Sequence, residues 1–296
     1  MIDLAIETNG LCRDFGARRV IDQVTLQVPR GTIFGLLGIN GSGKTTTIKM
    51  LMGHLRPTLG SVRILGRAYP RDLLEIRRRV GYVSENRYLY DWMSVEETLR
   101  FASAFHETWD VGKADQLLQR FELSPRMKVK HLSRGNRARL CLVVALAFNP
   151  ELIILDEPTS GLDAIIRRDF IENMIDEIEH EGRTVLFSTH LVDEVERVAD
   201  TAAIIHDGKL KIAAPVEALK NSIKKVRFST NGQPLDFGRI RGLIKSEAIG
   251  REQLLTIRDF NSDTMAMLCA AGAVDPQVIH LSLEDVFVEA VRLKAL

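Results

Sequence analysis

One stretch decides the fold of this chain: Gly38-Ile39-Asn40-Gly41-Ser42-Gly43-Lys44-Thr45. It fits the pattern G-x-x-x-x-G-K-[ST], in which glycines let backbone N–H groups turn inward around a phosphate. An apolar run at residues 32–37 precedes it, and residues 44–52 follow with the composition of a helix that Gly53 ends. Strand, glycine-rich turn and helix N-terminus together predict a phosphate-binding loop, because the helix dipole favours an anion at that end.

The side chains of this loop are the expected nucleotide contacts. Lys44 is long enough to reach the β- and γ-phosphate oxygens, and Thr45 offers a hydroxyl to Mg²⁺. We expect the nucleotide to be bound by the following residues: Gly38, Asn40, Gly41, Ser42, Gly43, Lys44, Thr45 and Thr46. The alternative is a plain strand-to-helix turn with no ligand.

A second motif places two carboxylates at the end of a strand. Residues 152–155 are a continuous apolar run, typical of a strand buried on both faces, and Asp156 and Glu157 follow it. In a doubly wound sheet this end lies beside the phosphate-binding loop. Asp156 suits Mg²⁺, directly or through water, and Glu157 suits orienting or deprotonating an attacking water. Such a pair alone more often begins a solvated loop, but the loop at Lys44 favours catalysis.

The rest of the chain alternates strands with helices. Apolar runs at 184–187 and 202–205 predict buried strands, 164–180 predicts a helix, and 91–126 is mostly helical in pattern. The expected fold class is therefore α/β, with a parallel sheet covered by helices on both faces. From residue 225 onward the pattern predicts a small separate α/β domain. Its candidate elements are strands at 226–229, 254–257 and 278–281 and helices at 262–271 and 283–293.

The length of 296 residues accommodates two domains. We place a nucleotide-binding domain at residues 1–218, with a helical subdomain at about 88–148, and a small α/β accessory domain at residues 219–296.

Composition excludes several classes of protein. The 40 Lys and Arg against 39 Asp and Glu give a net charge of +1, so no nucleic-acid partner is expected. The longest apolar run, residues 140–148, is far shorter than the roughly 20 residues of a membrane-spanning helix, and we expect no secretory signal. Cys12, Cys141 and Cys269 lack metal-binding spacing, which predicts free thiols in a reducing cytoplasm.

The run from Asp156 to Asp163, DEPTSGLD, resembles the Walker B and D-loop sequence of ATP-binding cassette (ABC) ATPases. The resemblance covers about residues 1–215 and implies the ABC ATPase form of the P-loop fold, with a mixed sheet core and a helical subdomain. It implies these roles: Phe15 stacks on adenine, Ser133, Arg134 and Gly135 form the signature loop, His190 contacts the γ-phosphate, and Asp163 lies at a dimer seam. The residues alone leave open a buried Phe15, a merely capping Ser133 and a structural His190.

The resemblance also implies a mechanism that one chain cannot complete. Two ATPase chains close face to face, and each ATP with its Mg²⁺ lies between one phosphate-binding loop and the other chain's signature loop. This chain carries one copy of each part, so we expect a homodimer. Lys44, Glu157 and His190 are the expected catalytic residues, and the helix that Ser133 opens directs its positive end at the partner's γ-phosphate.

Two positions depart from the family pattern. Glu85 stands where the family usually has a Mg²⁺-directed Gln, which gives Thr45, Glu85 and Asp156 as the expected magnesium ligands. The added negative charge predicts an altered Mg²⁺ dependence with activity retained. Arg134 stands where Gly is more common, and its guanidinium either reaches the partner's phosphates or points to solvent.

Aromatic residues gather after Glu85. Tyr82, Tyr88, Tyr90 and Trp92 fall within a short span. The resemblance implies a nearby groove that accepts a short helix of a membrane subunit, and amphipathic rings suit such an interface. The alternative is that these rings fill the core of the helical subdomain.

The resulting interpretation is the ATP-hydrolysing subunit of an ABC transporter, peripheral on the cytoplasmic face of the inner or plasma membrane and bound to a separate membrane-spanning subunit. The run at 282–287 is similar to the end of export-type subunits and favours export. A soluble ABC ATPase acting on nucleic acid or ribosomes usually has tandem cassettes or a coiled-coil insertion, and neither is present. Intact Lys44, Glu157 and His190 disfavour a purely regulatory module. The sequence does not identify the transported substance or the role of the accessory domain.

Overall fold

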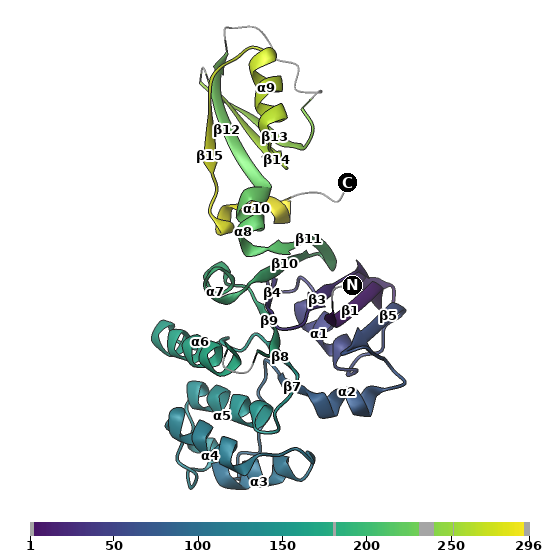
Figure 1. The fold of residues 1–296 in the computed structure, drawn as a ribbon, viewed down its shortest axis with the longest axis vertical. Helices are drawn as coiled ribbons and strands as arrows, with labels where there is room; N and C mark the ends of the chain where they lie inside the picture. Colours follow the sequence, from purple (N-terminus) through teal and green to yellow (C-terminus); the bar gives the residue numbers. More distant parts are fainter. Residues whose placement is uncertain (1–2, 180–181, 231–239, 251, 293–296) are drawn as a thin grey trace. The chain divides into compact units, whose positions relative to one another are not determined.

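The computed structural model describes residues 3–179, 182–230, 240–250 and 252–292 (Figure 1). It divides into two compact units, Met1–Leu210 and Lys211–Leu296, which are described separately below. Within the described residues, every helix is too short or too polar to cross a bilayer.

The first unit is built on a central sheet whose strands are buried on both faces. All residues of β4 (Ile33–Leu37), β8 (Leu152–Asp156) and β9 (Thr184–Thr189) are buried, as their continuous apolar runs predict. The sheet order is β10 (Thr201–His206), β4, β9, β8 and β7 (Val80–Val83), and β11 (Lys209–Pro215), which begins at the end of this unit and continues past Leu210, pairs with β10. The pairs from β10 to β7 are parallel, so the carboxyl ends of these strands meet at one edge.

A second sheet in this unit is antiparallel. It runs β2 (Arg18–Val24), β1 (Leu4–Phe15), β5 (Leu59–Ile64) and β6 (Arg67–Ala68), with β3 (Gln27–Pro29) also paired to β1. Residues 20–28 thus fall in two strands, β2 and β3, which Thr25 and Leu26 separate. The expected parallel sheet is the central sheet. The family resemblance implied a core with mixed strand directions, and the second, antiparallel sheet accounts for that mixture.

Helix α1 (Lys44–Leu51) fills the space between the two sheets (Figure 1). Its Ile48, Met50 and Leu51 are buried in one core with apolar residues of both sheets. On the other face lie α7 (Val192–Val198), which contacts β4 and β9, and α6 (Ala164–Glu179), which contacts α7. A Cβ on Gly35 would lie 3.1 Å from Val195 Cγ2, so the glycine lets α7 approach β4 closely. Helix α1 thus packs between the two sheets, and α6 and α7 cover the other face of the central sheet.

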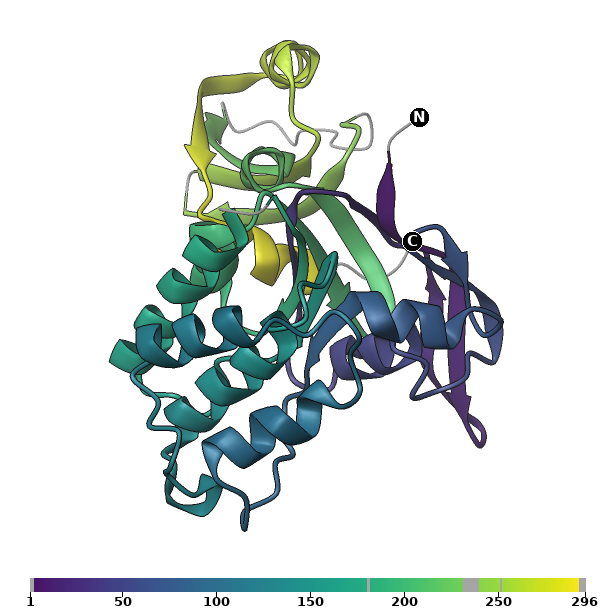
Figure 2. The same cartoon turned by 60° about the horizontal axis from the view of Figure 1, so that its bottom comes forward.

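Three helices form a separate group beyond β7 (Figure 2). They are α3 (Val95–Ser103), α4 (Val111–Arg120) and α5 (Arg134–Leu146), and the short helices α2 (Leu73–Arg79) and η1 (Val129–His131) lie before α3 and before α5 in the chain. Each of the three begins at a polar cap: Ser94 and Glu97 form a capping box on α3, Asp110 caps α4, and Ser133 caps α5. This group occupies the region expected to be helical.

The second unit has an antiparallel sheet with its own core. The sheet order is β13 (Leu243–Ile249), β14 (Glu252–Arg258), β12 (Ile223–Thr230) and β15 (Ala273–His280). Its helices are α8 (Val216–Ser222), α9 (Ser262–Ala270) and α10 (Leu283–Arg292). Val226, Phe228, Leu255, Ile257 and Leu268 are among the residues of its core. Strands at 226–229, 254–257 and 278–281 were predicted, whereas β13, which has no continuous apolar run, was not.

Candidate nucleotide site

The phosphate-binding loop joins β4 to α1 at the carboxyl edge of the central sheet. Gly41 and Gly43 adopt φ values of 80° and 111°, which L side chains rarely adopt. A Cβ on Gly38 would lie 2.5 Å from both Ile205 O and Ser42 Oγ, so only glycine fits there. The loop borders a hollow of about 360 Å³, within the range of ligand pockets. Its lining residues are Arg18, Val20, Asn40, Gly41, Gly43, Lys44, Thr45, Thr46, Glu85 and Glu157.

Lys44 is the central cation of this hollow. The side chain is 5% exposed, and its Nζ donates hydrogen bonds to Gly38 O at 2.7 Å and Ile39 O at 3.2 Å. Nζ also lies 3.0 Å from Glu157 Oε1, whose side chain is 6% exposed. A buried cation and a buried carboxylate therefore neutralise each other, and losing one partner would leave the other charge uncompensated.

Asp156 stands at the end of β8 beside α1. Its Oδ1 accepts hydrogen bonds from Thr45 Oγ1 at 3.1 Å and from Ser188 Oγ at 2.8 Å. Burial raises the pKa of Asp156, the bonds from Ser188 and Thr45 lower it, and the charges of Glu85 and Glu157 raise it further. Among the described residues no group donates to Oδ2, which is buried. This is the environment of a carboxylate that a cation would stabilise.

The oxygen atoms beside the hollow suit a Mg²⁺ ion that is bound partly by the protein and partly by the phosphates of a nucleotide. Thr45, Asp156 and Glu85 supply hard oxygen atoms around the hollow. Within the described ranges, no three His, Cys, Asp or Glu side chains converge as in an all-protein metal cage. Mg²⁺ usually keeps several waters and takes one or two carboxylates together with substrate phosphates, so a complete cage is not required.

Glu157 is held in a strained and specific position. Its φ is +46°, an uncommon value for a residue with a side chain and one that often accompanies functional sites. The backbone N–H donates to Ser188 Oγ at 2.9 Å, and Oε2 lies 2.9 Å from His190 Nδ1. The structure therefore brings Lys44, Glu157 and His190 together, on loops that follow three neighbouring strands.

The residues expected to form a signature loop lie elsewhere. Ser133 Oγ accepts the Asn136 N–H at 3.1 Å, and this bond caps α5 as the sequence predicts. A Cβ on Gly135 would lie 2.7 Å from Ile166 Cγ2, so this glycine allows α5 and α6 to pack closely. The described lining of the hollow includes none of Ser133, Arg134 and Gly135. Within one chain these residues do not complete the nucleotide site.

Arg134 and Asp163 lie near the same turn, and Asp163 has hydrogen-bond partners there. Arg134 is exposed, and its Nη1 lies 3.5 Å from the position that a Cβ on Gly161 would take. Asp163 Oδ1 accepts the N–H groups of Ile165 at 3.1 Å and Ile166 at 3.0 Å, so it caps α6. Both residues therefore lie at the turn between β8 and α6.

Phe15 ends β1 at the tip of the hairpin with β2. It is 45% exposed, which excludes the alternative of a buried core ring. Arg13 Cζ lies 4.6 Å from the centre of the Phe15 ring, and Phe15 pairs across the hairpin with Arg18. Arg18 and Val20 line the hollow, and the sequence analysis missed both. Their only sequence signal was their place on the strand opposite the expected adenine contact.

The aromatic residues after β7 form an exposed surface. Tyr88, Tyr90 and Trp92 are 82%, 53% and 66% exposed, so the alternative of core packing is wrong for these three. The rings of Tyr90 and Trp92 lie 5.8 Å apart, and the Tyr90 and Phe101 rings lie 5.7 Å apart. Tyr82 differs because it packs against the core of the first unit.

A groove of about 490 Å³ also lies in this part of the first unit. Its walls are Met52, His54, Leu74, Arg77, Arg78, Val80, Tyr82, Phe105, His106, Val144, Ala145 and Phe148. Burial lowers the pKa of both histidines, so the charge of the groove comes from its arginines. Its character is apolar and aromatic with a basic rim.

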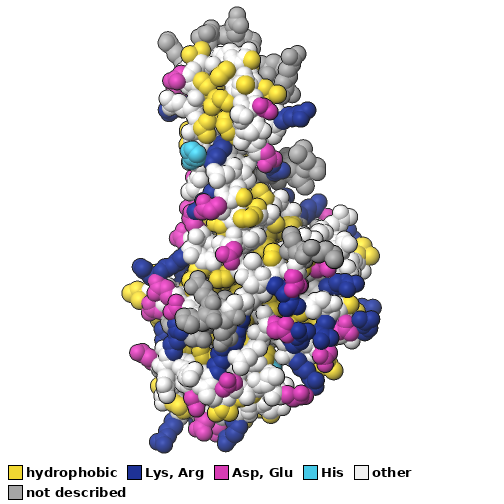
Figure 3. All heavy atoms as spheres, in the orientation of Figure 1, with side chains coloured by type: hydrophobic (Ala, Val, Ile, Leu, Met, Phe, Trp, Pro, Cys, Tyr) yellow, Lys and Arg dark blue, Asp and Glu magenta, His cyan; other side chains and the backbone are white. Residues whose placement is uncertain are grey.

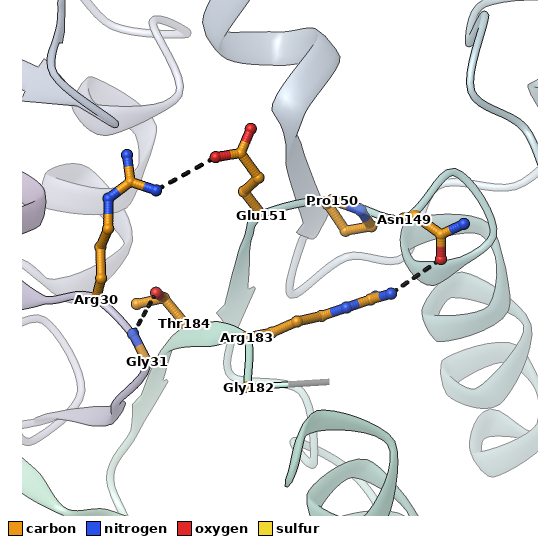
Figure 4. Close-up of a pocket in the computed structure, with 8 residues that line it drawn as sticks. All are labelled: Arg30, Gly31, Asn149, Pro150, Glu151, Gly182, Arg183 and Thr184. Carbon is orange, nitrogen blue, oxygen red and sulfur yellow. Dashed lines mark hydrogen bonds and ion pairs between the residues drawn. The ribbon is translucent and has the colours of Figure 1, made fainter. Parts of the chain in front are cut away.

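A larger hollow of about 530 Å³ lies at the amino ends of β8 and β9 (Figure 4). Its polar side chains bond to one another: Arg30 Nη1 to Glu151 at 3.2 Å and Arg183 Nη2 to Asn149 at 2.9 Å. Ligands of parallel sheets bind at the carboxyl ends of the strands, which is the opposite edge. Size alone therefore does not identify the functional site.

Comparisons with known proteins agree with this geometry. Residues 21–160 match the sequence profile of the ABC transporter family. An uncharacterized ABC transporter ATP-binding protein of Methanocaldococcus jannaschii is 30% identical over 289 residues, covering 96% of this chain and 98% of that protein. The bacitracin transport ATP-binding protein BcrA of Bacillus licheniformis is 34% identical over 222 residues, which cover 74% of this chain and 72% of BcrA.

Solved structures show the same fold. The ATP-binding subunit of an ABC transporter superposes with a TM-score of 0.67 at 30% identity, covering 73% of this chain and 92% of that one. A dimeric bacterial ABC transporter cassette gives a TM-score of 0.64 at 24% identity, covering 71% of this chain and 98% of that one. This chain belongs to the ABC transporter family, as one of its ATP-binding subunits.

Proposed function

We propose that the chain hydrolyses ATP with Mg²⁺ and that this hydrolysis drives a membrane transporter. One observation carries the proposal: Glu157, at the end of β8, lies within 3.0 Å of Lys44 Nζ and 2.9 Å of His190 Nδ1, beside a phosphate-binding loop. A base and a phosphate-binding cation that line one hollow, with a histidine bonded to the base, are the parts that phosphoryl transfer to water requires.

The Lys44–Glu157 pair suggests how substrate prepares the site. Triphosphate oxygens entering the hollow compete with Glu157 for Lys44, because both are anions within reach of the same buried ammonium. Once Lys44 turns to the phosphates, Glu157 is released to accept the proton of an attacking water. His190 remains bonded to Oε2 and keeps the carboxylate oriented. Until substrate is present, the carboxylate of Glu157 thus stays paired with the ammonium group of Lys44.

The magnesium assignment rests on Thr45, Asp156 and Glu85. When bound, Mg²⁺ neutralises charge that develops on the phosphate oxygens. The support is that Thr45 and Ser188 both bond to Asp156 Oδ1, whereas Asp156 Oδ2 and Ser42 Oγ are buried atoms to which no described group bonds. Both orphaned atoms border the phosphate-binding loop.

We propose a homodimer in which each chain completes the other's site. The support is that Ser133, Arg134 and Gly135 form a capped helix start that does not line the chain's own hollow. An N-terminus whose N–H groups face outward can stabilise the γ-phosphate held by a second copy. Asp163 and Arg134, at the turn after β8, are then expected at the seam between the chains, and Phe15 is expected to stack on adenine.

The aromatic surface and basic groove are the proposed docking site of a membrane-spanning subunit. Exposed Tyr88, Tyr90 and Trp92 suit a protein interface better than solvent. The chain would then lie on the cytoplasmic face of the membrane, as a peripheral subunit. On the face drawn in Figure 3, Lys and Arg side chains lie among Asp and Glu, which favours a protein partner over nucleic acid.

We propose export as the direction of transport. The support is the C-terminal run at 282–287 and the similarity to relatives described as bacitracin transport and daunorubicin resistance proteins. We also propose that residues 1–218 act as the nucleotide-binding domain and residues 219–296 as an accessory domain.

The test is steady-state ATP hydrolysis by the purified chain with Mg²⁺. Glu157→Gln is expected to lower kcat by roughly 10²- to 10⁴-fold with ATP binding retained, as for loss of a general base. Glu151→Gln is the matched control, because Glu151 lies at the other end of β8, and its kcat should stay within about two-fold of the parent. A Glu157→Gln variant as active as the control would refute the assignment.

A further inference from the structure

Arg87 connects two loops that the sequence treats separately. It lies two residues after Glu85, is half-buried, and adopts a positive φ of 46°. Its Nη2 donates hydrogen bonds to Pro158 O at 2.7 Å and to Ser160 O at 3.0 Å. The guanidinium therefore holds the backbone turn that follows the carboxylate pair of β8.

This contact costs free energy that the fold must recover. Burial lowers the pKa of Arg87, which shows that the charged form is partly desolvated there. The positive φ of a non-glycine residue adds backbone strain. Two charge-assisted bonds to carbonyls at 2.7 and 3.0 Å offset these costs. Because specific hydrogen bonds hold Arg87 in an unfavourable conformation, we infer that the link between its loop and the turn at 158–160 has a function.

The turn at 158–160 is held from its other side as well. Thr159 Oγ1 donates to Glu194 Oε1 at 2.5 Å, and Thr189 Oγ1 donates to Glu194 Oε2 at 2.5 Å. Thr189 directly precedes His190. The turn thus lies between Arg87, from the loop of Glu85, and Glu194, from the helix that follows His190.

We propose that Arg87 is a positioning residue, which joins the loop of Glu85 to the turn at 158–160 and so sets the geometry of Glu157 on one side and of Asp163 on the other. Arg87 does not line the nucleotide hollow, so it acts on catalysis and on chain pairing and leaves ATP binding unaffected. The inference rests on the proposed function, because it concerns how the same site is regulated by its surrounding loops.

The test compares Arg87→Ala and Arg87→Lys with a matched arginine. Arg137 is similarly half-buried and bonds to Asp91, at the far end of the same loop, without reaching the turn at 158–160. Arg87→Ala is expected to lower kcat about tenfold, to leave the KM for ATP within about two-fold, and to abolish cooperativity in ATP. Arg87→Lys should recover part of kcat, because an ammonium can donate to one carbonyl. Arg137→Ala should match the parent in all three.

Thermal unfolding and far-UV circular dichroism check that each variant is folded. If Arg87→Ala does not fold, Arg87→Lys carries the comparison, with an expected kcat below both the parent and Arg137→Ala. Equal kcat and cooperativity in the Arg87 and Arg137 variants would overturn the inference. A parent chain without ATPase activity, or one whose activity survives Glu157→Gln, would instead refute the proposed function.

Discussion

At the scale of single residues, the site is a set of closely spaced charges, and we propose that substrate changes how they pair. Lys44 and Glu157 satisfy each other across 3.0 Å in the hollow, and Asp156 keeps one buried oxygen atom without a described donor. Glu85 lies at the rim and adds negative charge. Burial raises the pKa of Asp156, and the charge of Glu85 raises it further. Removing the charge of Glu85 therefore changes the electrostatic environment of Asp156.

Glu85→Gln tests the departure from the family pattern. Loss of one carboxylate from the magnesium ligands is expected to raise the half-saturating Mg²⁺ concentration about three- to tenfold while activity at saturating Mg²⁺ is retained. The pKa of Asp156 falls when the neighbouring charge is removed, so the acid limb of the pH–rate profile should move to lower pH. The measurements are Mg²⁺ titrations of ATPase rate at several pH values. Superimposable titrations of parent and variant would mean that Glu85 has no role at the metal.

At the scale of elements, the loops after parallel strands are fastened to one another by buried side chains. Glu194, on α7, is 4% exposed and accepts hydroxyl groups from Thr159 and Thr189 at 2.5 Å each. It therefore fixes the start of α7 against both the turn after β8 and the loop after β9. Buried acceptors of this kind are expensive to remove because the hydroxyl groups that donate to them are left without an acceptor.

Glu194→Ala is expected to lower the free energy of unfolding by about 1–3 kcal/mol, the cost of leaving two buried hydroxyls unsatisfied. It should also lower kcat, since His190 and the turn at 158–160 lose a common anchor. Urea unfolding followed by tryptophan fluorescence measures the first effect. Asp193→Ala, an exposed neighbour on α7, is the control and should change stability by no more than about 0.5 kcal/mol. A Glu194 variant as stable as this control would contradict the role.

Sequence patterns predicted elements where burial is continuous or a motif fixes the backbone. The runs of β4, β8 and β9 and the start of α1 at Lys44 were predicted for that reason. The antiparallel sheet of the first unit was not, because its pairing joins strands distant in sequence, such as β1 and β5. Arg18, Arg87, Ser188 and Glu194 were missed for the same reason, since only folding brings them to the site.

At the scale of the whole molecule, the chain holds two units, and the nucleotide hollow lies in the first. That unit carries the phosphate-binding loop, Glu157 and His190, and also the capped start of α5 at Ser133, which is not among the residues lining the hollow. The second unit has a separate core around Phe228 and Ile257. In the proposed homodimer, the start of α5 from one copy completes the nucleotide hollow of the other.

The most direct test of a nucleotide site shared by two copies of the chain is complementation between two inactive variants. Lys44→Ala lacks a working phosphate-binding loop, and Ser133→Arg blocks the helix start that acts on the partner. Neither alone should hydrolyse ATP, but a mixed dimer has one intact composite site, so an equimolar mixture should recover about a quarter of the parent rate. The contradicting result is a mixture, shown by differential tags to contain the mixed dimer, that is no more active than the two variants measured apart.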